Sequence, residues 1–592
     1  MSDSLVDESG SIRKKWTGRL PVALLYPNLY PVAVSNLGYQ LVYATLNADE
    51  DIVCERFVYP AKDTPFRSLE SSRPLTDFPL VFASISFEHD FPRLAAMLAA
   101  GGFPAEAGGR SSAIAPGMPL VMIGGVAMFI NPEPLAAFAD LIAIGEAEAI
   151  LPELMVVLKN YAQTSRKEVT YQAAATVSGC YAPGLYQFDY DSVGRITHIR
   201  PEPGLPSQVR KAVQNATVIA GHSKLFSPQA ELDMHMVELG RGCSRACRFC
   251  AAGYVYRPPR LWDQEAVGKA LAQRPEGVQR IGLLGMEMSP DLDTVNLAGI
   301  LKDSGCMLSF SSLRADRLSP ELLGVLAQSE LKSAAIAADG ASERLRRIIN
   351  KNISAKDLLD ASVRLVKAGI FHLKIYVMIG LPGETEADLA EFAELIRSIR
   401  AAILPLGQAR GRVSELTLSL NCFVPKAWTP FQYCAFGGAV AQLGECSSGN
   451  LEEEQRLVLS SLKEKIRFLR RMLKNEANLH IICDSPEQAM EQAVYARADR
   501  RIAPVLLARG AGRLSFKMAM KKYLDDGRAG FGTWRYALRE RGQDELFPWD
   551  VIDHGFTPGY MWREYERALR GLATPACEPE RCRSCGVCHG KA

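Results

Sequence analysis

The sequence contains no pattern that predicts a signal peptide or a membrane-spanning segment. Residues 1–20 are polar and charged, without the apolar core of a signal peptide. No run of about 18 uncharged apolar residues occurs, so we expect no membrane partner. The 14 cysteines of such a chain are better explained as metal ligands and reduced core thiols than as disulfides. Together these absences predict a cytoplasmic protein.

An excess of charge of one sign is also absent. The 68 Lys and Arg residues nearly balance the 66 Asp and Glu residues, and the net charge is +2. No overall field therefore favours nucleic acid as a partner, although a local basic face stays open. The hydrophobic share of 48% and the charged share of 23% are typical of globular protein with sizeable cores. A length of 592 residues predicts roughly three or four domains.

Three cysteines stand close together after a short apolar run. Cys243, Cys247 and Cys250 have the spacing C-x3-C-x2-C and follow residues 234–239. Three thiolates on one loop can bind three irons of a four-iron four-sulfur cluster and leave the fourth iron free to bind a small molecule. The alternative is a zinc site, which normally needs four ligands. His235 is the nearby candidate for a fourth ligand, but it falls within an expected strand.

This spacing resembles the signature of the radical SAM superfamily. The resemblance implies that Cys243, Cys247 and Cys250 bind the cluster and that S-adenosylmethionine chelates its free iron. Reductive cleavage of the sulfonium would then give methionine and a 5′-deoxyadenosyl radical, with the electron coming from a donor of the flavodoxin or ferredoxin type. The resemblance also places Phe249 near the adenine of SAM.

Short β-rich runs alternate with amphipathic helical runs between residues 231 and 440. This alternation predicts a parallel sheet with helical crossovers, and six such units match the partial (β/α)6 TIM-type barrel of radical SAM enzymes. Functional residues in such barrels gather at the C-terminal ends of the strands, where the cysteine loop also stands. The expected strands are 234–239, 280–284, 307–312, 333–338, 373–379 and 415–423.

Polar and glycine-containing segments after these strands resemble the SAM-binding motifs of the superfamily. Residues 285–287 stand where the superfamily has a Gly-Gly-Glu motif, and residues 380–385 read Gly-Leu-Pro-Gly-Glu-Thr. The second segment could equally be the strand–helix turn of any α/β protein. Asp339-Gly340 replaces the Glu-Ala pair of many relatives. The SAM-binding candidates are Gly285, Glu287, Ser312, Arg314, Asp339, Ser342, Gly380 and Pro382.

Residues 20–205 are expected to form a second α/β unit, with strands at 22–25, 80–85, 119–123 and 141–144. The unit resembles the cobalamin-binding domain, a Rossmann-like open sheet that precedes many radical SAM barrels. A ligand of such a sheet lies beyond the carboxyl ends of its strands. The candidates for contact with cobalamin are Ser35, Asn36, Ser84, Gly124, Gly125, Gly145 and Glu146.

The Asp-x-His-x-x-Gly motif that supplies an imidazole to cobalt does not occur in this chain. Cobalamin would therefore have no histidine ligand from the loop after the first strand. The alternative is a fold of the same type that has lost the cofactor and serves as a lid or substrate domain. Further matches point to the cobalamin-binding-domain-containing subgroup of radical SAM proteins, largely of unassigned substrate; they are residues 35–38, 131–135, 423–426, 429–432 and 548–550.

The last 22 residues form a cysteine-rich tail. Cys577, Cys582, Cys585 and Cys588 have the spacing C-x4-C-x2-C-x2-C in a segment with little apolar content, so a core role does not explain them. Consecutive C-x2-C steps occur in ferredoxin-type sites, which favours a second iron–sulfur cluster. A tetrathiolate zinc site and a redox-active or cobalt-directed thiol are the alternatives. His589 could substitute for one ligand.

The region 441–570 has a mostly helical pattern with many basic residues. Most such residues form a solvated helix face, and RNA binding is the functional alternative. The basic residues are Lys463, Lys465, Arg467, Arg470, Arg471, Lys474, Arg497, Arg500, Arg501, Arg509 and Arg513.

The expected fold is therefore α/β with six segments. They are an N-terminal extension (1–19), a cobalamin-binding-like Rossmann domain (20–205), a linker (206–230), a partial barrel (231–440), a helical domain (441–570) and the tail (571–592).

The expected function is radical SAM chemistry for cobalamin-linked methylation of an unactivated carbon. One alternative is radical rearrangement, oxidation or sulfur insertion without cobalamin. RNA is one candidate substrate for this reaction, and the tail cluster would relay electrons or sulfur. A metal-binding, RNA-associated factor without enzymatic activity is the alternative from another class.

Overall fold

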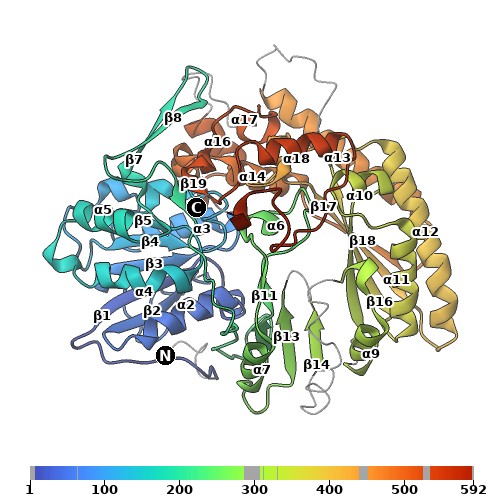
Figure 1. The fold of residues 1–592 in the computed structure, drawn as a ribbon, viewed down its shortest axis with the longest axis horizontal. Coiled ribbons are helices and arrows are strands. Elements are labelled where there is room, and N and C mark those ends of the chain that lie inside the picture. Colours follow the sequence, from blue (N-terminus) through green and yellow to red (C-terminus); the bar gives the residue numbers. More distant parts are fainter. Residues whose placement is uncertain are drawn as a thin grey trace.

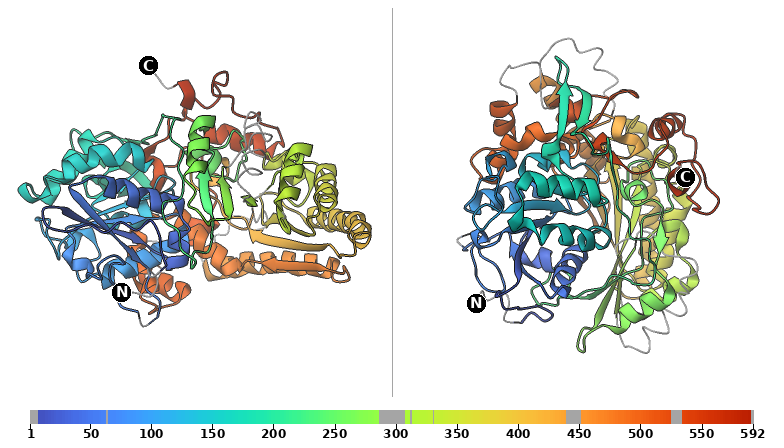
Figure 2. Two further views of the ribbon diagram at one scale, coloured as in Figure 1. Left: turned by 90° about the horizontal axis from the view of Figure 1, so that it is seen from below. Right: turned by 60° about the vertical axis from the view of Figure 1, so that its left-hand side comes forward.

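The computed structural model describes residues 7–62, 64–285, 307–310, 313–329, 331–438, 451–524 and 534–589. An N-terminal α/β domain and a barrel-like α/β domain lie side by side, and C-terminal helices pack against both (Figures 1 and 2). The α/β fold expected from the sequence is confirmed. No helix in the described ranges is long and apolar enough to cross a membrane.

The N-terminal domain is built on a six-stranded sheet in the order β2-β1-β3-β4-β5-β6. The first five strands are parallel, and β6 closes the edge in the antiparallel direction. Continuous apolar runs form the inner strands because helices cover both faces of such a sheet. The strands are β1 (Leu20–Tyr26), β2 (Ile52–Val58), β3 (Leu80–Ser84), β4 (Leu120–Gly124), β5 (Leu141–Ala143) and β6 (Cys180–Tyr181).

Helices connect these strands and pack on the sheet. They are α1 (Tyr30–Val34), α2 (Leu37–Ala48), α3 (Phe91–Ala100), α4 (Ala147–Leu158) and α5 (Arg166–Thr176). Asn36 begins α2 as its N-cap, because its side chain accepts a hydrogen bond from the Tyr39 amide at 2.9 Å. A hairpin of β7 (Tyr186–Tyr190) and β8 (Ile196–Pro201) leads out of the domain.

The second domain is an open barrel of parallel strands. One group runs β10-β13-β14 and the other β15-β16-β17-β18. Among the described residues, an isolated parallel bridge between Leu313 and Ile336 joins the two groups. The strands are β10 (His235–Glu238), β13 (Arg280–Leu284), β14 (Met307–Phe310), β15 (Ser333–Asp339), β16 (His372–Ile379), β17 (Glu415–Cys422) and β18 (Leu479–Cys483).

Strand β18 is a seventh strand beyond the six expected, and it comes from the segment predicted to be mostly helical. It pairs in parallel with β17. Amphipathic helices cover the outside of the barrel because one face of each is apolar. They are α7 (Gln264–Ala272), α9 (Pro320–Gln328), α10 (Glu343–Ile348), α11 (Ala355–Lys367), α12 (Glu386–Gln408) and α13 (Leu451–Met472).

The remaining C-terminal helices connect the two domains. Helix α15 packs on α3, and Gly510 at its end lies so close to Pro92 that a Cβ would meet the Pro92 carbonyl oxygen at 2.0 Å. Strand β19 (Ile552–Asp553) pairs with β9 (Val209–Arg210), far from it in sequence. The helices are α14 (Pro486–Arg497), α15 (Ala503–Gly510), α16 (Phe516–Tyr523), α17 (Trp534–Leu538) and α18 (Tyr560–Leu569).

A buried carboxylate ties the C-terminal helices to the N-terminal domain. Glu133 is fully buried and accepts hydrogen bonds from Arg500 Nε at 2.8 Å and from the Tyr181 hydroxyl at 2.5 Å. Removal of one partner from a buried ion pair leaves the other charge uncompensated, which costs about 3 kcal/mol or more.

We therefore expect Glu133→Ala to lower the free energy of unfolding by about 3 kcal/mol, measured as a shift in the denaturant midpoint. The matched control is Asp360→Ala, because Asp360 forms an exposed ion pair with Lys356 at 2.5 Å. That pair should contribute less than about 0.5 kcal/mol. Equal midpoints for the two variants would contradict a connecting role for Glu133.

Candidate active site between the N-terminal sheet and the barrel

The cysteine loop follows β10, at the C-terminal end of the first barrel strand. The loop leaves from the short strand β11 (Gly240–Arg241), turns back through α6 (Ala252–Val255) and returns in β12 (Arg260–Leu261). Cys247 is buried, whereas Cys243 and Cys250 are partly exposed. Phe249 is half-buried and packs against the core. The three thiols thus share one loop at the C-terminal ends of the strands, where TIM-type barrels carry their functional groups.

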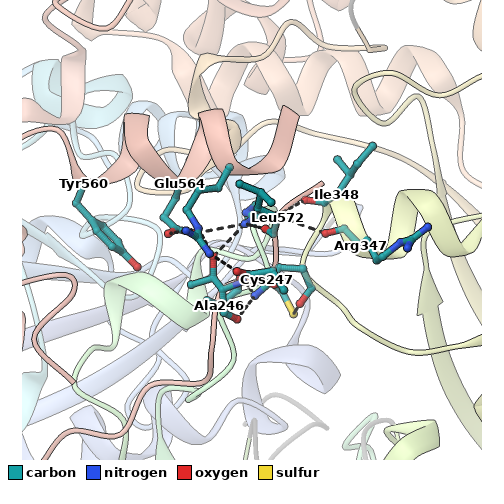
Figure 3. Close-up of polar contacts among 12 residues, drawn as sticks. Ala246, Cys247, Arg347, Ile348, Tyr560, Glu564 and Leu572 are labelled. Atoms are coloured by element: carbon teal, nitrogen blue, oxygen red, sulfur yellow. Dashed lines mark hydrogen bonds and ion pairs between the residues drawn. The ribbon is translucent and has the colours of Figure 1, made fainter. Parts of the chain in front are cut away.

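Arg248 holds this loop from inside, and its side chain is fully buried. The guanidinium donates to the carbonyl oxygen of Ile348 at 2.8 Å and to that of Leu572 at 2.6 Å, and it lies 3.6 Å from the carboxylate of Glu564. Helix α18, which carries Glu564, lies across the loop (Figure 3). Arg248 was not among the residues predicted from the sequence, although an arginine within a C-x3-C-x2-C run was a usable signal.

Asn350 holds the loop from the barrel side. Its amide donates to the carbonyl oxygens of Ala246 at 3.1 Å and Thr574 at 3.0 Å, and its oxygen accepts from the Thr574 amide at 2.9 Å. Asn350 adopts a left-handed φ of 56°, a conformation that asparagine tolerates better than most residues. The loop is therefore fixed to both the barrel and the tail.

A charged pair lies beside Cys247. Lys351 Nζ lies 2.6 Å from an Asp339 carboxylate oxygen, and both residues interact electrostatically with Cys247. Burial raises the pKa of the Cys247 thiol, and the Lys351 ammonium partly opposes this shift. Burial alone would lower the pKa of Lys351, but Asp339 and Cys247 raise it above its usual value. Lys351 is thus a cation positioned to favour thiolate at Cys247.

The donor set of this loop suits an iron–sulfur cluster. A cubane takes one thiolate per iron, so its ligands surround a cluster and need not converge on one point. Within the described residues, no three His, Cys, Asp or Glu side chains converge on a position for a single ion. His235, the candidate fourth zinc ligand, is fully buried, and its Nε2 lies 2.8 Å from the Ala270 carbonyl oxygen. Its ring stacks on Phe226 instead of facing the thiols.

The predicted SAM-binding residues do not all lie in one place. Arg314 and Asp339 lie close together because both contact Lys351. Arg314 donates to the Lys351 carbonyl oxygen at 2.8 Å, and Asp339 pairs with the Lys351 ammonium. Gly285 directly follows β13 and is exposed. Ser342 caps α10 and its hydroxyl donates to Asp388 at 2.5 Å, which is a structural role. Glu287 and Ser312 lie outside the described residues.

Gly380 and Pro382 form a turn that packs against α13. A Cβ on Gly380 would lie 2.7 Å from Leu462 Cδ2, and the Gly380 amide donates to Glu384 at 2.9 Å. Glu384 in turn pairs with Lys465 at 2.8 Å. These contacts account for the glycine and the glutamate of the turn by local packing.

A cavity of about 420 Å³ lies where the N-terminal sheet faces the cysteine loop. Its walls include six residues predicted to contact cobalamin and, from the barrel side, Arg241, Tyr256 and Leu284. The six are Asn36, Ser84, Gly124, Gly125, Gly145 and Glu146. The cavity therefore lies at the carboxyl ends of the parallel strands, where open α/β sheets bind ligands.

Ser35 is not among the residues that line the cavity. Its hydroxyl donates to the Pro31 carbonyl oxygen at 2.7 Å and accepts from the Leu232 amide at 2.9 Å. Neighbouring backbone explains two of the cavity glycines. Gly125 (φ 99°) and Gly145 (φ 133°) would each place a Cβ within 2.5 Å of a carbonyl oxygen, that of Ile85 or Ala212.

Ion pairs join the cavity wall to the cysteine loop. Arg241 lies 2.7 Å from Glu148, 2.8 Å from Glu238 and 3.2 Å from Glu146. Glu146 also pairs with Arg260, on the returning strand β12. Burial alone would lower the pKa of Arg241, but Glu148 and Glu238 raise it. The predicted cobalamin contact Glu146 is thus also part of a charged connection between the two domains.

Many of the basic residues of the C-terminal region have acidic or carbonyl partners. Arg497 is fully buried and donates to the Cys434 carbonyl oxygen at 2.7 Å. Arg500 pairs with Glu133, Arg501 with Asp499, and Arg509 with Glu491. Lys465 pairs with Glu384 and Lys463 with Glu487. These residues connect structural elements, and RNA binding by this region stays a prediction.

The first tail cysteine lies next to the cysteine loop, and the other three are within electrostatic range of it. Cys577 interacts electrostatically with Cys588, Cys585 and Cys582. The Cys577 amide donates to the Ser244 carbonyl oxygen at 2.7 Å.

Two family models match this chain. The model described as "Radical SAM proteins, N-terminal" matches residues 38–183, and that of the radical SAM superfamily matches residues 237–396. An uncharacterized protein from Methanocaldococcus jannaschii is 25% identical over 492 residues, which is 82% of this chain and 90% of that protein.

Other similar proteins match either a shorter part of this chain or at a lower sequence identity. A tRNA-2-methylthio-N(6)-dimethylallyladenosine synthase from Geobacter metallireducens is 25% identical over 221 residues, which is 33% of this chain and 49% of that enzyme. Among solved structures, the cobalamin-dependent S-adenosylmethionine radical enzyme OxsB, with aqua-cobalamin and S-adenosylmethionine bound, gives a TM-score of 0.47. The match has 13% sequence identity and covers 87% of this chain and 84% of OxsB.

We expect Lys351→Gln to reduce SAM cleavage about tenfold, because it removes the cation beside Cys247 and leaves Asp339 without its partner. The measurement is formation of 5′-deoxyadenosine by the dithionite-reduced protein. Lys356→Gln is the matched control, since Lys356 is exposed on α11. Wild-type turnover in the Lys351 variant would show that this charge does not contribute to the site.

Proposed function

Because this chain belongs to the radical SAM superfamily, as its cysteine spacing predicts, we propose that it methylates an unactivated carbon with cobalamin held between its two domains. The observation that carries this proposal is the position of the cavity. One wall is formed by the strand ends of the N-terminal sheet and the other by residues that flank the cysteine loop, Arg241 and Tyr256. A molecule in this cavity would lie between the two parts of the chain that the proposal assigns to the two cofactors.

The SAM half of the site rests on residues at the barrel strand ends. Cys243, Cys247 and Cys250 would hold the cluster, which when bound supplies the electron that cleaves SAM to a 5′-deoxyadenosyl radical. Asp339 can accept hydrogen bonds from hydroxyl groups, and Arg314 can donate to a carboxylate. Phe249 offers an aromatic face next to the loop. Cys247 itself is buried, which limits the access of water to this thiol.

The cobalamin half of the site rests on the cavity. Its volume of about 420 Å³ is within the range of pockets for drug-sized ligands, so it would hold only part of the larger cobalamin. Cobalamin bound there would act as the carrier of the methyl group. Among the described residues that line the cavity there is no histidine, so these residues would offer no imidazole to a bound corrinoid. Asn36 and Ser84 supply polar groups, and Gly124 supplies exposed backbone for a polar cofactor.

Sulfur insertion is the second candidate function. Its support is that a methylthiotransferase-type relative matches part of the chain and that the tail, which carries four further thiols, contacts the cysteine loop. Product analysis separates the two candidates, because methylation adds a CH2 unit to the substrate whereas methylthiolation adds sulfur as well.

Loss of a single loop cysteine should abolish SAM cleavage. We expect Cys247→Ala to form no 5′-deoxyadenosine under dithionite, because two thiolates cannot replace the three-thiolate site. Cys483→Ala is the matched control, since Cys483 is a half-buried thiol on β18 away from the loop. Undiminished cleavage by the Cys247 variant would rule out this loop as the cluster site.

Blocking the cavity should abolish corrinoid binding and leave the loop intact. Gly38 lines the cavity near the start of α2, and a Cβ there would meet only Asn36 Oδ1, at 3.5 Å. We expect Gly38→Trp to weaken hydroxocobalamin binding about tenfold or more, measured by the visible spectrum of anaerobically reconstituted protein after gel filtration. SAM cleavage should persist.

Gly268→Trp is the matched control, since Gly268 lies within α7, does not line the cavity and has open space around its Cβ position. Failure of the wild-type protein to retain cobalamin would contradict the proposal, as would equal retention by the Gly38 and Gly268 variants.

A further inference from the structure

The cysteine-rich tail is not used by the function proposed above, yet it lies against the cysteine loop. From α18 the chain continues through Leu572 and Thr574, which bind Arg248 and Asn350 of the site. It then reaches Cys577, whose amide donates to the Ser244 carbonyl oxygen at 2.7 Å. Ser244 follows Cys243 directly, so the first tail cysteine is hydrogen-bonded through its backbone to the cysteine loop.

The tail folds back so that Cys577 is within electrostatic range of Cys582, Cys585 and Cys588. The Cys585 carbonyl oxygen accepts a hydrogen bond from the Thr557 amide at 2.9 Å. Gly586 has a φ of 85°, and a Cβ there would lie 2.5 Å from Thr557 Cγ2. Glycine is therefore required at the turn between the last two cysteines. Cys577 and Cys585 are 7% and 3% exposed, which is unusual for a terminal segment with so few apolar residues.

A buried arginine lies next to these thiols. Arg257 is 4% exposed, and its guanidinium interacts electrostatically with Cys585, Cys577 and Cys588. Its Nη1 donates to the Tyr560 hydroxyl at 3.0 Å and its Nε to the Gly253 carbonyl oxygen at 2.8 Å. The rings of Tyr254 and Tyr560 lie 4.9 and 5.7 Å from the guanidinium carbon.

In the described part of the chain, no carboxylate forms an ion pair with Arg257. A buried cation without a counter-charge is costly, so its environment should supply an anion. Neutral thiols do not supply one. Four thiolates around a metal centre do, because metal binding deprotonates cysteine and leaves a net negative charge at the site.

From this arrangement we infer that Cys577, Cys582, Cys585 and Cys588 bind a second iron–sulfur cluster and that Arg257 is its buried counter-ion. The spacing of the last three cysteines, C-x2-C-x2-C, is that of ferredoxin-type sites. We infer iron and not zinc because the tail is in direct contact with the cysteine loop, whose three thiols suit an iron–sulfur cluster. The inference depends on neither cobalamin nor the identity of the substrate.

The test uses the full-length chain, purified and reconstituted without oxygen, with iron and zinc counted per chain. We expect about eight irons in the wild-type protein, four for each cubane. Cys247→Ala should keep about four irons in the tail, with the Mössbauer spectrum of a four-iron cluster. The tail variants Cys582→Ser and Cys588→Ser should also keep about four irons, those of the cysteine loop. Both tail residues are partly exposed, so these changes leave the core intact.

The role of Arg257 is tested in the Cys247→Ala background, where only the tail cluster is left. Arg257→Gln removes a positive charge next to the cluster, so we expect the midpoint potential of the tail cluster to become more negative. Arg581→Gln is the matched control, because Arg581 stands between tail cysteines but its side chain is 86% exposed. We expect little change there, since solvent screens an exposed charge.

One zinc ion per chain in the tail would overturn the inference, and so would the complete loss of iron in Cys247→Ala. Equal potentials in the Arg257 and Arg581 variants would remove Arg257 from the proposed site. Failure of corrinoid binding or of SAM cleavage would leave the iron count of the tail unchanged, so the two proposals fail separately.

Discussion

A loop that carries three cysteines within eight residues cannot fold around its own apolar core, so other parts of the chain must hold it. Three polar side chains do this, of which Arg248 and Asn350 are buried and Arg241 is 12% exposed. Arg241 connects the loop to acidic residues of the N-terminal domain, Arg248 connects it to the start of the tail, and Asn350 connects it to the barrel. Each has its partners in a different part of the sequence. The rest of the architecture, including the C-terminal helices, depends on bringing these partners together.

These connections explain why buried charge is concentrated around the site. A buried ion pair does little for net stability, because desolvation offsets the attraction, but the loss of one partner is costly. Such pairs therefore fix position more than they add stability. Glu146 has two roles, since it pairs with Arg260 and also lines the cavity at the strand ends. A cofactor that binds there would meet a wall whose geometry is set by charge pairs on the other side.

The sequence predicted those features that depend on local pattern. Apolar runs located β1, β3, β4 and β5 and the first six barrel strands, because a buried parallel strand is apolar along its whole length. The edge strands β2 and β6 and the seventh barrel strand β18 were not predicted, because β2 contains Glu55 and Arg56, β6 has two residues, and β18 lies in a region of helical pattern. The cysteine spacing predicted the family because the motif is local.

Features that depend on distant contacts could not be read from the sequence. Lys351 was not recognised as a neighbour of Cys247, and nothing in the pattern indicates that the tail lies against Ser244. Glycine patterns were ambiguous as well. Gly124, Gly125 and Gly145 were predicted to admit a cofactor, and all three line the cavity, but close backbone at Ile85 and Ala212 already requires two of them to be glycine. Domain boundaries and the individual SAM and cobalamin contacts stay predictions.

The central claim is that the loop cysteines leave one iron free to bind SAM. The most direct measurement is electron paramagnetic resonance of the reduced Cys582→Ser protein, in which the loop cluster is observed alone, before and after addition of SAM. The account predicts that SAM changes the g-values of this signal, because its amino and carboxylate groups enter the coordination sphere of the free iron. A cluster signal that SAM leaves unchanged would contradict it.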